Sequence, residues 1–261
     1  MGTLDSIRAV AARGRAGPFG SRGKYGIDGG VIAPTIFAVL QAGLAGTVLW
    51  AIRHRRRGLA GLAGLAGLAV AGSAGSFLYS TGTGKREVWA ELLDELRLHG
   101  DEHVLDVGCG RGAVLVLAAR RLPEGQAVGA DLWRRRDQSG NSRAAAERNA
   151  ELEGVRDRVS IVDADARDLP FPSGSFDVVV SNLTIHNIAD ADGRSQALDE
   201  AVRVLRPGGR MLIADPGADR YAGKLRAAGC ADITVRRLDW RTWFGVPGHH
   251  LILVAASKPS G

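Results

Sequence analysis

The segment HVLDVGCGRGAVL, residues 103–115, constrains the fold of this chain more than any other stretch. An apolar run contains Asp106 and leads into glycines at alternate positions, Gly108, Gly110 and Gly112. Glycine lets a backbone approach a ligand and a helix approach a strand. The segment is therefore typical of a strand, a tight loop and a helix that together hold a nucleotide-like ligand.

Strand-like and helix-like runs alternate from residue 85 onward. A short amphipathic helix is predicted over 85–98, because its apolar residues recur at helical spacing. Strands are predicted at 103–107, 126–132, 158–164, 176–183, 210–215, 232–238 and 249–256. Helices are predicted between them at 112–121, 142–153, 194–205 and 219–228. This alternation predicts an α/β fold, with a mostly parallel sheet covered by helices on both faces.

Two long windows without a charged residue precede this alternation. They run from Gly29 to Ile52 and from Gly58 to Gly84, and the basic run RHRRR at 53–57 separates them. Each window is longer than the roughly 20 residues that a helix needs to cross a bilayer. The sequence therefore predicts three parts: a basic cytosolic tail (1–28), an N-terminal transmembrane helical hairpin (29–80, with helices at about 30–52 and 59–80) and a catalytic domain (85–261).

The topology of the hairpin leaves alternatives open. Glycine in the repeat of the second window weakens helix propensity, so this window could instead form a flexible linker. Two spans with a cytosolic domain place RHRRR outside, which the positive-inside rule disfavours, whereas basic residues of the tail favour that arrangement. A single span followed by a segment on the membrane surface is the rival. We predict the hairpin, and hence a multi-pass protein of the cell membrane with a cytosolic catalytic domain.

Charge and cysteine content exclude several classes of protein. The net charge is +6, but residues 1–58 hold nine Lys and Arg against two Asp and Glu, and the remainder holds 25 against 26. The basic excess thus suits anionic lipid headgroups, and no nucleic-acid partner is expected. Two cysteines, Cys109 and Cys230, are too few for a disulfide framework or a cysteine-rich metal site. A reducing compartment and no metal are therefore expected.

Acids at the ends of three successive predicted strands indicate the ligand, because ligands bind at the carboxyl ends of parallel strands. The glycine loop alone also fits a dinucleotide-dependent oxidoreductase, with Ala113 at the last place of the fingerprint. Asp106 opposes that alternative, since a carboxylate beside the loop repels a pyrophosphate. Asp106 can instead receive an ammonium group, Asp131 two ribose hydroxyls and Asp165 an adenine amine. These groups together describe S-adenosylmethionine.

Four motifs follow one another along this part of the chain: VLDVGCGRG, ADLW, DADARDLPFPSGSFDVVVSN and LDEAVRVLRPGGRMLIAD. In this order they resemble the class I S-adenosylmethionine-dependent methyltransferases, particularly the methyltransferase type 11 subgroup that is similar to the UbiE enzymes of quinone biosynthesis. The resemblance runs from about residue 85 to the C-terminus and leaves the predicted hairpin outside. It implies a Rossmann-like, seven-stranded sheet whose last strand, HHLILVAA, is antiparallel.

The resemblance also implies which residues contact the cofactor. Acids and glycines would line its methionine and ribose parts, the start of the third motif would flank adenine, and the end of the fourth strand would lie beside the transferred methyl group. The expected cofactor-binding residues are Asp106, Gly108, Cys109, Gly110, Asp131, Leu132, Asp165, Ala166 and Ser181.

Methyl transfer is an in-line displacement in which alignment of the acceptor supplies much of the catalysis. Asn182, at the end of the fourth strand, is one catalytic candidate. His186 is the candidate general base, since imidazole titrates near neutrality. Its alternative role is a hydrogen bond to the backbone at a helix start.

Three further segments have two interpretations each. The arginine-rich insertion at 132–142 either covers the cofactor or forms a solvated loop, and the loop is slightly favoured. The aromatic segment 241–245 could form a lid over an apolar acceptor, whereas core packing is at least equally favoured for Trp240, and Trp133 could pack on adenine. Tyr25 and Asp28 form either a simple turn or a contact with the catalytic face.

The sequence as a whole predicts a membrane-anchored S-adenosylmethionine-dependent methyltransferase whose partners are a membrane and a small or lipid-like acceptor. Two alternatives remain: an NAD-dependent oxidoreductase, and a non-catalytic membrane protein that retains a cofactor-binding fold.

Overall fold

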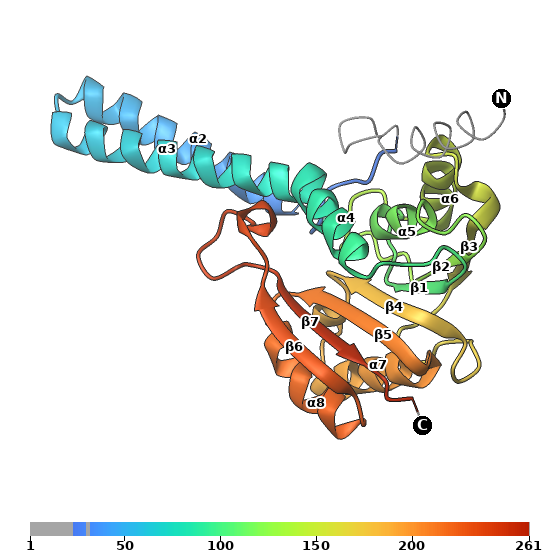
Figure 1. Cartoon of the computed structure of the whole chain (residues 1–261). Coiled ribbons are helices and arrows are strands. Elements are labelled where there is room, and N and C mark those ends of the chain that lie inside the picture. Colours follow the sequence, from blue (N-terminus) through green and yellow to red (C-terminus); the bar gives the residue numbers. More distant parts are fainter. Residues whose placement is uncertain (1–22, 30–31, 261) are drawn as a thin grey trace, which may run out of the picture.

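The structure is a computed structural model that describes residues 23–29 and 32–260. Figure 1 shows an α/β domain from which a long helical hairpin projects. Most of the predicted basic tail, residues 1–22, lies outside the described residues.

One seven-stranded sheet forms the centre of the domain. Its strands are β1 (His103–Val107), β2 (Gln126–Asp131), β3 (Val159–Asp163), β4 (Phe176–Asn182), β5 (Leu205–Asp215), β6 (Ala231–Arg237) and β7 (Ile252–Ser257). They pair in the order β3-β2-β1-β4-β5-β7-β6. Neighbouring strands are parallel except where β7 lies antiparallel to β5 and to β6. The predicted seven-stranded sheet with an antiparallel last strand is confirmed.

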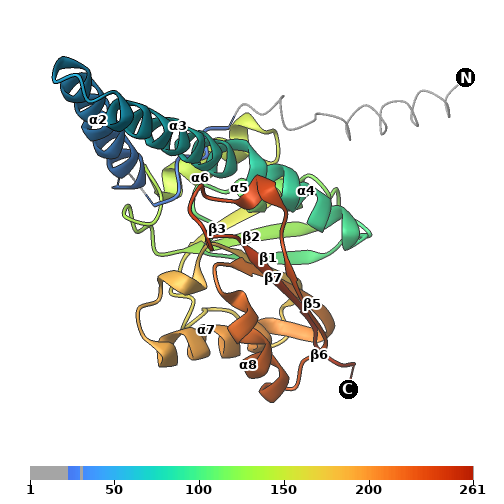
Figure 2. The same cartoon turned by 90° about the vertical axis from the view of Figure 1, so that its left-hand side faces the viewer.

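Helices cover both faces of this sheet, as Figure 2 shows. One face carries α4 (Lys85–Glu95), α5 (Ala113–Ala119) and α6 (Arg143–Leu152), and the other carries α7 (Ala191–Val204) and α8 (Tyr221–Ala227). Each face has its own apolar core. Val104 and Leu105, neighbours on β1, are fully buried in opposite cores, because successive side chains of a strand point to opposite faces.

One strand boundary differs clearly from the prediction. β5 begins at Leu205, which pairs with Phe176, and the register then shifts before Arg210 pairs with Val178. The segment Pro207–Gly209 breaks the apolar pattern, so the sequence placed the start of this strand at Arg210. The irregular pairing therefore extends the strand through residues that have low strand propensity.

α2 (Ile32–Arg53) and α3 (Arg57–Tyr79) form the hairpin in Figure 1. At about 1.5 Å per residue these helices extend about 33 to 35 Å, close to the roughly 30 Å of a bilayer's hydrocarbon core. Both are long and apolar enough to cross a membrane by length and composition. Large apolar side chains along them are exposed, among them Val39, Leu49, Leu62, Leu65 and Leu68. The glycine-rich second window is helical throughout, so it is not a flexible linker.

α3 continues into the domain without a loop. A π-helical turn, Ser80–Gly84, joins it directly to α4. The hydroxyls of Ser76 and Ser80 both donate to the backbone oxygen of Trp243, at 2.9 and 2.6 Å. A side chain at Gly84 would collide with the Arg241 carbonyl. The close contact between this turn and the loop before β7 therefore fixes the hairpin to the domain.

The residues just before the hairpin, 23–29, form a segment that we call the N-terminal strap. It lies on the α/β domain, where the Lys24 amide donates to the Asn149 side chain over 2.9 Å. Tyr25 is buried, and the Arg86 guanidinium lies 4.4 Å from the centre of its ring. The contact with the catalytic part, one of the two interpretations of this segment, is thus present.

Candidate active site

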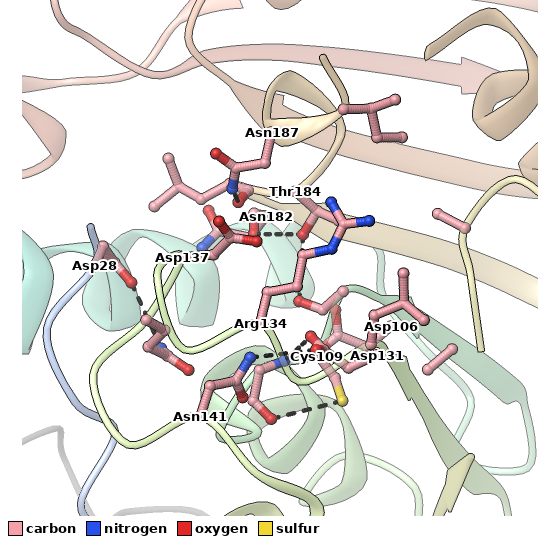
Figure 3. A pocket seen from close by; sticks show the side chains of 18 of the residues that line it. Asp28, Asp106, Cys109, Asp131, Arg134, Asp137, Asn141, Asn182, Thr184 and Asn187 are labelled. Atoms are coloured by element: carbon pink, nitrogen blue, oxygen red, sulfur yellow. Dashed lines mark hydrogen bonds between the residues drawn. The ribbon is translucent and has the colours of Figure 1, made fainter. Parts of the chain in front are cut away.

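A cleft of about 730 Å³ lies at the carboxyl ends of β1, β2, β3 and β4. Every residue that the sequence predicted for the site lines this cleft, except Ser181 and His186. Figure 3 shows Asp106, Cys109 and Asp131 gathered in one part of the cleft and Asp28 set apart from them. The cleft therefore lies where ligands bind in parallel α/β sheets.

The glycine loop forms the floor of the cleft. Gly108 and Gly110 adopt positive φ angles of 75° and 53°, which residues with a side chain rarely adopt. A Cβ atom at Gly108 would also collide with the Thr184 side chain. Cys109 between them is buried, and burial raises the pKa of its thiol well above the ordinary value. The thiol is therefore protonated and serves as a small packing group, not as a nucleophile.

Asp106 brings an unsatisfied carboxylate to this floor. It is 1% exposed, and its Oδ2 atom has no hydrogen-bond partner among the described residues. Burial, reinforced by the nearby charge of Asp131, raises the pKa of Asp106 to about 8. A buried acceptor without a donor is costly, so this position favours a ligand that brings a cationic N–H donor.

Asp131 is held in a fixed orientation at the end of β2. Its Oδ2 accepts the Gly110 amide at 2.8 Å, and its Oδ1 accepts the Trp133 amide and the Asn141 side-chain amide. Asn141 is buried and lines the cleft, and its own Oδ1 has no partner among the described residues. Hydroxyl donors of a ligand would satisfy this pair of side chains.

These donor and acceptor groups fit S-adenosylmethionine. The unpartnered oxygen of Asp106 suits its amino group, and the acceptors of Asp131 and Asn141 suit its ribose hydroxyls. A pyrophosphate fits less well, because it would approach a floor whose buried side chains offer acceptors and negative charge.

The part of the cleft expected to hold adenine differs from the prediction in one contact, that of Asp165 with Arg167. Asp165 and Ala166 line the cleft as predicted. The Asp165 carboxylate, however, is paired with the Arg167 guanidinium, with the shortest N–O distance 2.6 Å, and this pairing lowers the pKa of Asp165. An adenine amine would therefore share Asp165 with Arg167.

Two predicted residues at the end of β4, Ser181 and Asn182, have different surroundings. Asn182 lines the cleft, and its Oδ1 accepts the indole N–H of Trp89 at 2.8 Å. Ser181 is buried behind the cleft, where its hydroxyl donates to the Val107 carbonyl on the neighbouring strand. Adjacent residues of a strand point to opposite faces, so only Asn182 faces the cleft.

His186 does not line the cleft. Its Nδ1 lies 2.9 Å from the Oδ1 of Asp215, a fully buried carboxylate at the end of β5. Asp215 also accepts the amides of Thr184 and His186, so it holds the whole turn after β4. The position of His186 therefore corresponds to a structural contact with a buried acid, and the general-base hypothesis gains no support from it.

The arginine-rich insertion borders the cleft, contrary to the slight preference for a solvated loop. Arg134 through Gln138 and Asn141 all line it. The Arg111 amide donates to the Gln138 side chain at 2.9 Å, which ties the insertion to the glycine loop. No residue of this insertion beyond Leu132 was assigned to the site, because an Arg-rich polar run has the composition of an exposed loop.

Asp28 and Lys85 also line the cleft. Neither was among the predicted site residues, although a contact with the catalytic face was one interpretation of Asp28. Asp28 immediately precedes the first uncharged window, and Lys85 immediately follows the second. Their positions next to the two windows were the only hint in the sequence of a contact between them. Nothing in the local pattern predicts a contact between residues 57 positions apart.

The aromatic residues near β7 serve the hairpin and do not form a lid over the cleft. Within the segment 240–246, the ring centre of Phe244 lies 6.3 Å from that of Phe77 on α3. The Trp240 ring stacks on the Tyr79 ring, with 5.4 Å between their centres. Trp133 likewise does not line the cleft, and its indole N–H donates to Asp163.

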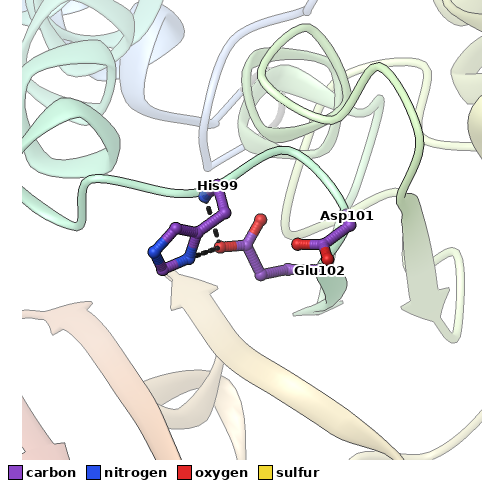
Figure 4. Close-up of side chains that lie close together, drawn as sticks. All are labelled: His99, Asp101 and Glu102. Atoms are coloured by element: carbon purple, nitrogen blue, oxygen red, sulfur yellow. Dashed lines mark hydrogen bonds and ion pairs between the residues drawn. The ribbon is translucent and has the colours of Figure 1, made fainter.

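A second, polar groove of about 760 Å³ lies beside the start of β1. His99, Asp101 and Glu102 are close enough together there to share a metal ion (Figure 4). Both Glu102 oxygens, however, accept backbone amides, from His99 at 2.6 Å and from Gly100 at 2.8 Å. These hydrogen bonds give Glu102 a structural role in holding its own loop.

Comparison with known proteins gives consistent similarities. Residues 105–213 match the family described as "Methyltransferase domain". The chain is 33% identical over 131 residues to a demethylmenaquinone methyltransferase of Symbiobacterium thermophilum, covering 49% of each chain. It is 32% identical over 151 residues to the 27-O-demethylrifamycin SV methyltransferase of Amycolatopsis mediterranei, covering 55% of this chain and 52% of that protein. The chain thus spans about half the length of the curated relatives it matches.

Solved structures share the fold. The [4+2]-cyclase SpnF aligns with a TM-score of 0.54 at 22% identity, covering 66% of this chain and 80% of that one. This likeness concerns architecture alone, and the cyclase activity of SpnF shows that the architecture does not fix the reaction. The family match supports a methyltransferase domain over residues 105–213.

Proposed function

We propose that this protein is a membrane-anchored methyltransferase that transfers a methyl group from S-adenosylmethionine to a small, lipid-like acceptor of the quinone type. One observation carries the proposal: the cleft has the unpartnered Oδ2 atom of Asp106 in its floor and residues from both ends of the hairpin in its wall. The relative that is named for demethylmenaquinone supports an acceptor of this class.

S-adenosylmethionine supplies a methyl group that its sulfonium has already activated. The residues of the cleft then have to bind and align. Asp106 would hold the amino group and Asp131 the ribose, while Asn182, fixed by Trp89, would orient the acceptor. Alignment of this kind can supply much of the rate acceleration without an obligatory acid or base, which agrees with the position of His186 outside the cleft.

Membrane anchoring is supported by the surface of the hairpin. Leucines of α3 such as Leu62 and Leu68 are 67% and 72% exposed, whereas water-soluble domains rarely leave a long apolar surface uncovered. The basic residues 53–57 lie at the tip, one helix length from the domain. Trp50, near the same tip, is half exposed, as interfacial tryptophans are.

The position of the hairpin also brings the cleft close to the proposed bilayer. Asp28 lies four residues before the first residue of α2, and Lys85 lies six residues after the last residue of α3. Both line the cleft. An acceptor dissolved in the membrane would therefore meet the cleft at a raised effective concentration.

A tag at residue 56 tests the topology. In intact cells a hairpin with a cytosolic domain exposes this tag to external protease. Protection of the tag would contradict the hairpin and favour a single span with a surface-bound segment.

Labelling tests the activity. Purified full-length protein is incubated with a membrane lipid extract and radioactive methyl donor, and the products are separated. Label in an organic-soluble product supports the proposal, and label confined to the aqueous fraction contradicts a lipid-like acceptor. Thermal shifts with S-adenosylhomocysteine and with NADH, measured on the same protein, separate the methyltransferase from the oxidoreductase alternative.

A further inference from the structure

Lys85 is a buried lysine in the wall of the cleft. It lies in the first turn of α4 and is 2% exposed. Its Nζ donates to both carboxylate oxygens of Asp28, at 2.6 and 2.7 Å, and Asp28 is its ionic partner among the described residues. An ammonium group has three N–H donors, so one donor remains for a group inside the cleft.

Lys85 belongs to the same part of the cleft as Asn182. Residues four apart on a helix lie on one face, which places Lys85 beside Trp89 on α4. Trp89 in turn donates to the Asn182 side chain. Figure 3 shows Asp28, the partner of Lys85, apart from Asp106 and Asp131. The ammonium therefore lies away from the groups that suit the cofactor and near those left for the acceptor.

We propose that Lys85 binds the ionised hydroxyl oxygen of the acceptor. The assignment rests on the proposed function and names the side chain of that cleft that holds the acceptor oxygen. A buried ammonium stabilises an oxygen anion because few water molecules compete with it. An acceptor without an ionisable oxygen would leave this donor unsatisfied.

The transfer balances with this arrangement. The acceptor hydroxyl releases its proton to water, and the resulting negative charge rests on the oxygen beside Lys85. An electron pair of the anion, on oxygen or on the adjacent carbon, forms the new bond to the methyl carbon. The bond from sulfur to methyl breaks at the same time and its electron pair stays on sulfur. If carbon is methylated, its hydrogen leaves as the proton that restores the hydroxyl.

Asp28 has a positioning role in this scheme. It neutralises Lys85 before the acceptor enters, and it belongs to the N-terminal strap that leads into α2. Without Asp28 the ammonium would remain in the cleft and could still bind an anion. If Lys85 binds the acceptor, loss of Lys85 should therefore matter more than loss of Asp28. If the ion pair is purely structural, loss of either residue should have the same effect.

2-Naphthol is a suitable probe, because its anion absorbs at longer wavelength than the neutral form. It is added near neutral pH to full-length protein in detergent micelles, with S-adenosylhomocysteine at saturation. A neighbouring cation lowers the pKa of an acid by about 1 to 3 units, so the anion fraction should rise by about tenfold or more over that in micelles alone.

Three variants assign the effect to Lys85. Lys85→Met should abolish the anion band, Lys85→Arg should restore it, and Asp28→Asn should keep it. Lys224→Met is the matched control, since it removes a lysine of α8 that pairs with Asp199 of α7, outside the cleft. With an acceptor found by lipid labelling, Lys85→Met should lower kcat/KM by about 100-fold or more, with the affinity for S-adenosylhomocysteine within about threefold of wild type.

Absence of the anion band in the wild-type protein overturns the assignment, whether or not any variant folds. So does a band that survives in Lys85→Met, or one that Asp28→Asn and Lys85→Met lose equally. Failure of the proposed function has a different signature: a wild-type protein that binds no S-adenosylhomocysteine or methylates nothing. The band is read without methyl transfer, so the two failures are distinguishable.

Discussion

Trp89 on α4 donates its indole N–H to the Oδ1 of Asn182 at the end of β4, over 2.8 Å. The bond joins the helix that continues from the hairpin to the strand end that lines the cleft. It also fixes which atoms of the Asn182 amide remain available to a ligand, because Oδ1 is already engaged.

Trp89→Phe should therefore loosen Asn182 without removing it. We expect kcat to fall by about 10- to 100-fold, because a misaligned acceptor loses much of the benefit of positioning. Loss of this hydrogen bond at the partly exposed Asn182 should also cost about 0.5 to 1.5 kcal/mol of stability. Turnover and denaturant unfolding measure the two effects. Trp240→Phe, at an exposed position, is the control. Unchanged kcat in Trp89→Phe would show that Asn182 needs no such support.

Asp106→Asn should weaken cofactor binding and stabilise the free protein. Loss of a charged hydrogen-bond partner should lower the affinity for S-adenosylhomocysteine by about 10- to 100-fold in calorimetry. The pKa of Asp106 in the folded protein is about 8, above its ordinary value of 3.8, so wild type loses stability as pH rises from about 4 to 8. The variant should thus unfold at higher temperature than wild type at pH 9, and the difference should vanish near pH 4.

The control for this substitution is Asp163→Asn, at the exposed end of β3 outside the cleft. It should change neither the affinity nor the pH dependence of unfolding. Equal affinity of wild type and Asp106→Asn would remove Asp106 from the cofactor site.

Cofactor binding should release protons. At pH 7 the Asp106 carboxyl of the free protein is mostly protonated, and an ammonium group placed beside it favours the ionised form. Binding should then release about one proton, and affinity should fall as pH drops below 8. Titration calorimetry in buffers of different ionisation enthalpy measures this number. A binding enthalpy that does not depend on the buffer would show that Asp106 keeps its proton or is already ionised.

Leu65→Arg should detach the hairpin from membranes. Leu65 is 66% exposed near the middle of α3, and an arginine at the centre of a spanning helix costs about 2.5 to 3.5 kcal/mol on insertion scales. We expect the variant to be extracted by alkaline carbonate, whereas Leu65→Ile should remain in the pellet. S-adenosylhomocysteine affinity should be the same in both, since Leu65 does not line the cleft. Equal sedimentation of the two variants would argue against insertion of α3.

The central sheet could be predicted from sequence because its strands are short apolar runs between helices of a different period. β1 and β4 match the predicted strands almost residue for residue. The start of β5 was missed because Pro207 and the two glycines after it hide a strand that an irregular register still pairs. The π-helical turn between α3 and α4 was also missed, since polar residues and glycine there resemble a linker.

The convergence of Asp106, Asp131 and Asp165 in one cleft was equally accessible to prediction, because acids at neighbouring strand ends converge by the geometry of a parallel sheet. The proposed acceptor end was not. Asp28 and Lys85 meet through a strap and a helix on either side of the hairpin, and such a pairing depends on tertiary packing alone. For His186 the sequence left two roles open, and in the structure its ring contacts the buried acid Asp215, so the general-base role stays a prediction.

The unbroken helix from Arg57 to Glu95 has a mechanical consequence. No loop separates α3, which would face lipid in the proposed anchor, from α4 in the wall of the cleft, so a tilt of α3 would move Lys85 and Trp89 through the π-helical turn. Helices respond to bilayers of different thickness by tilting. The host membrane would then act as a tuning element for acceptor alignment, and turnover in vesicles should vary with acyl-chain length.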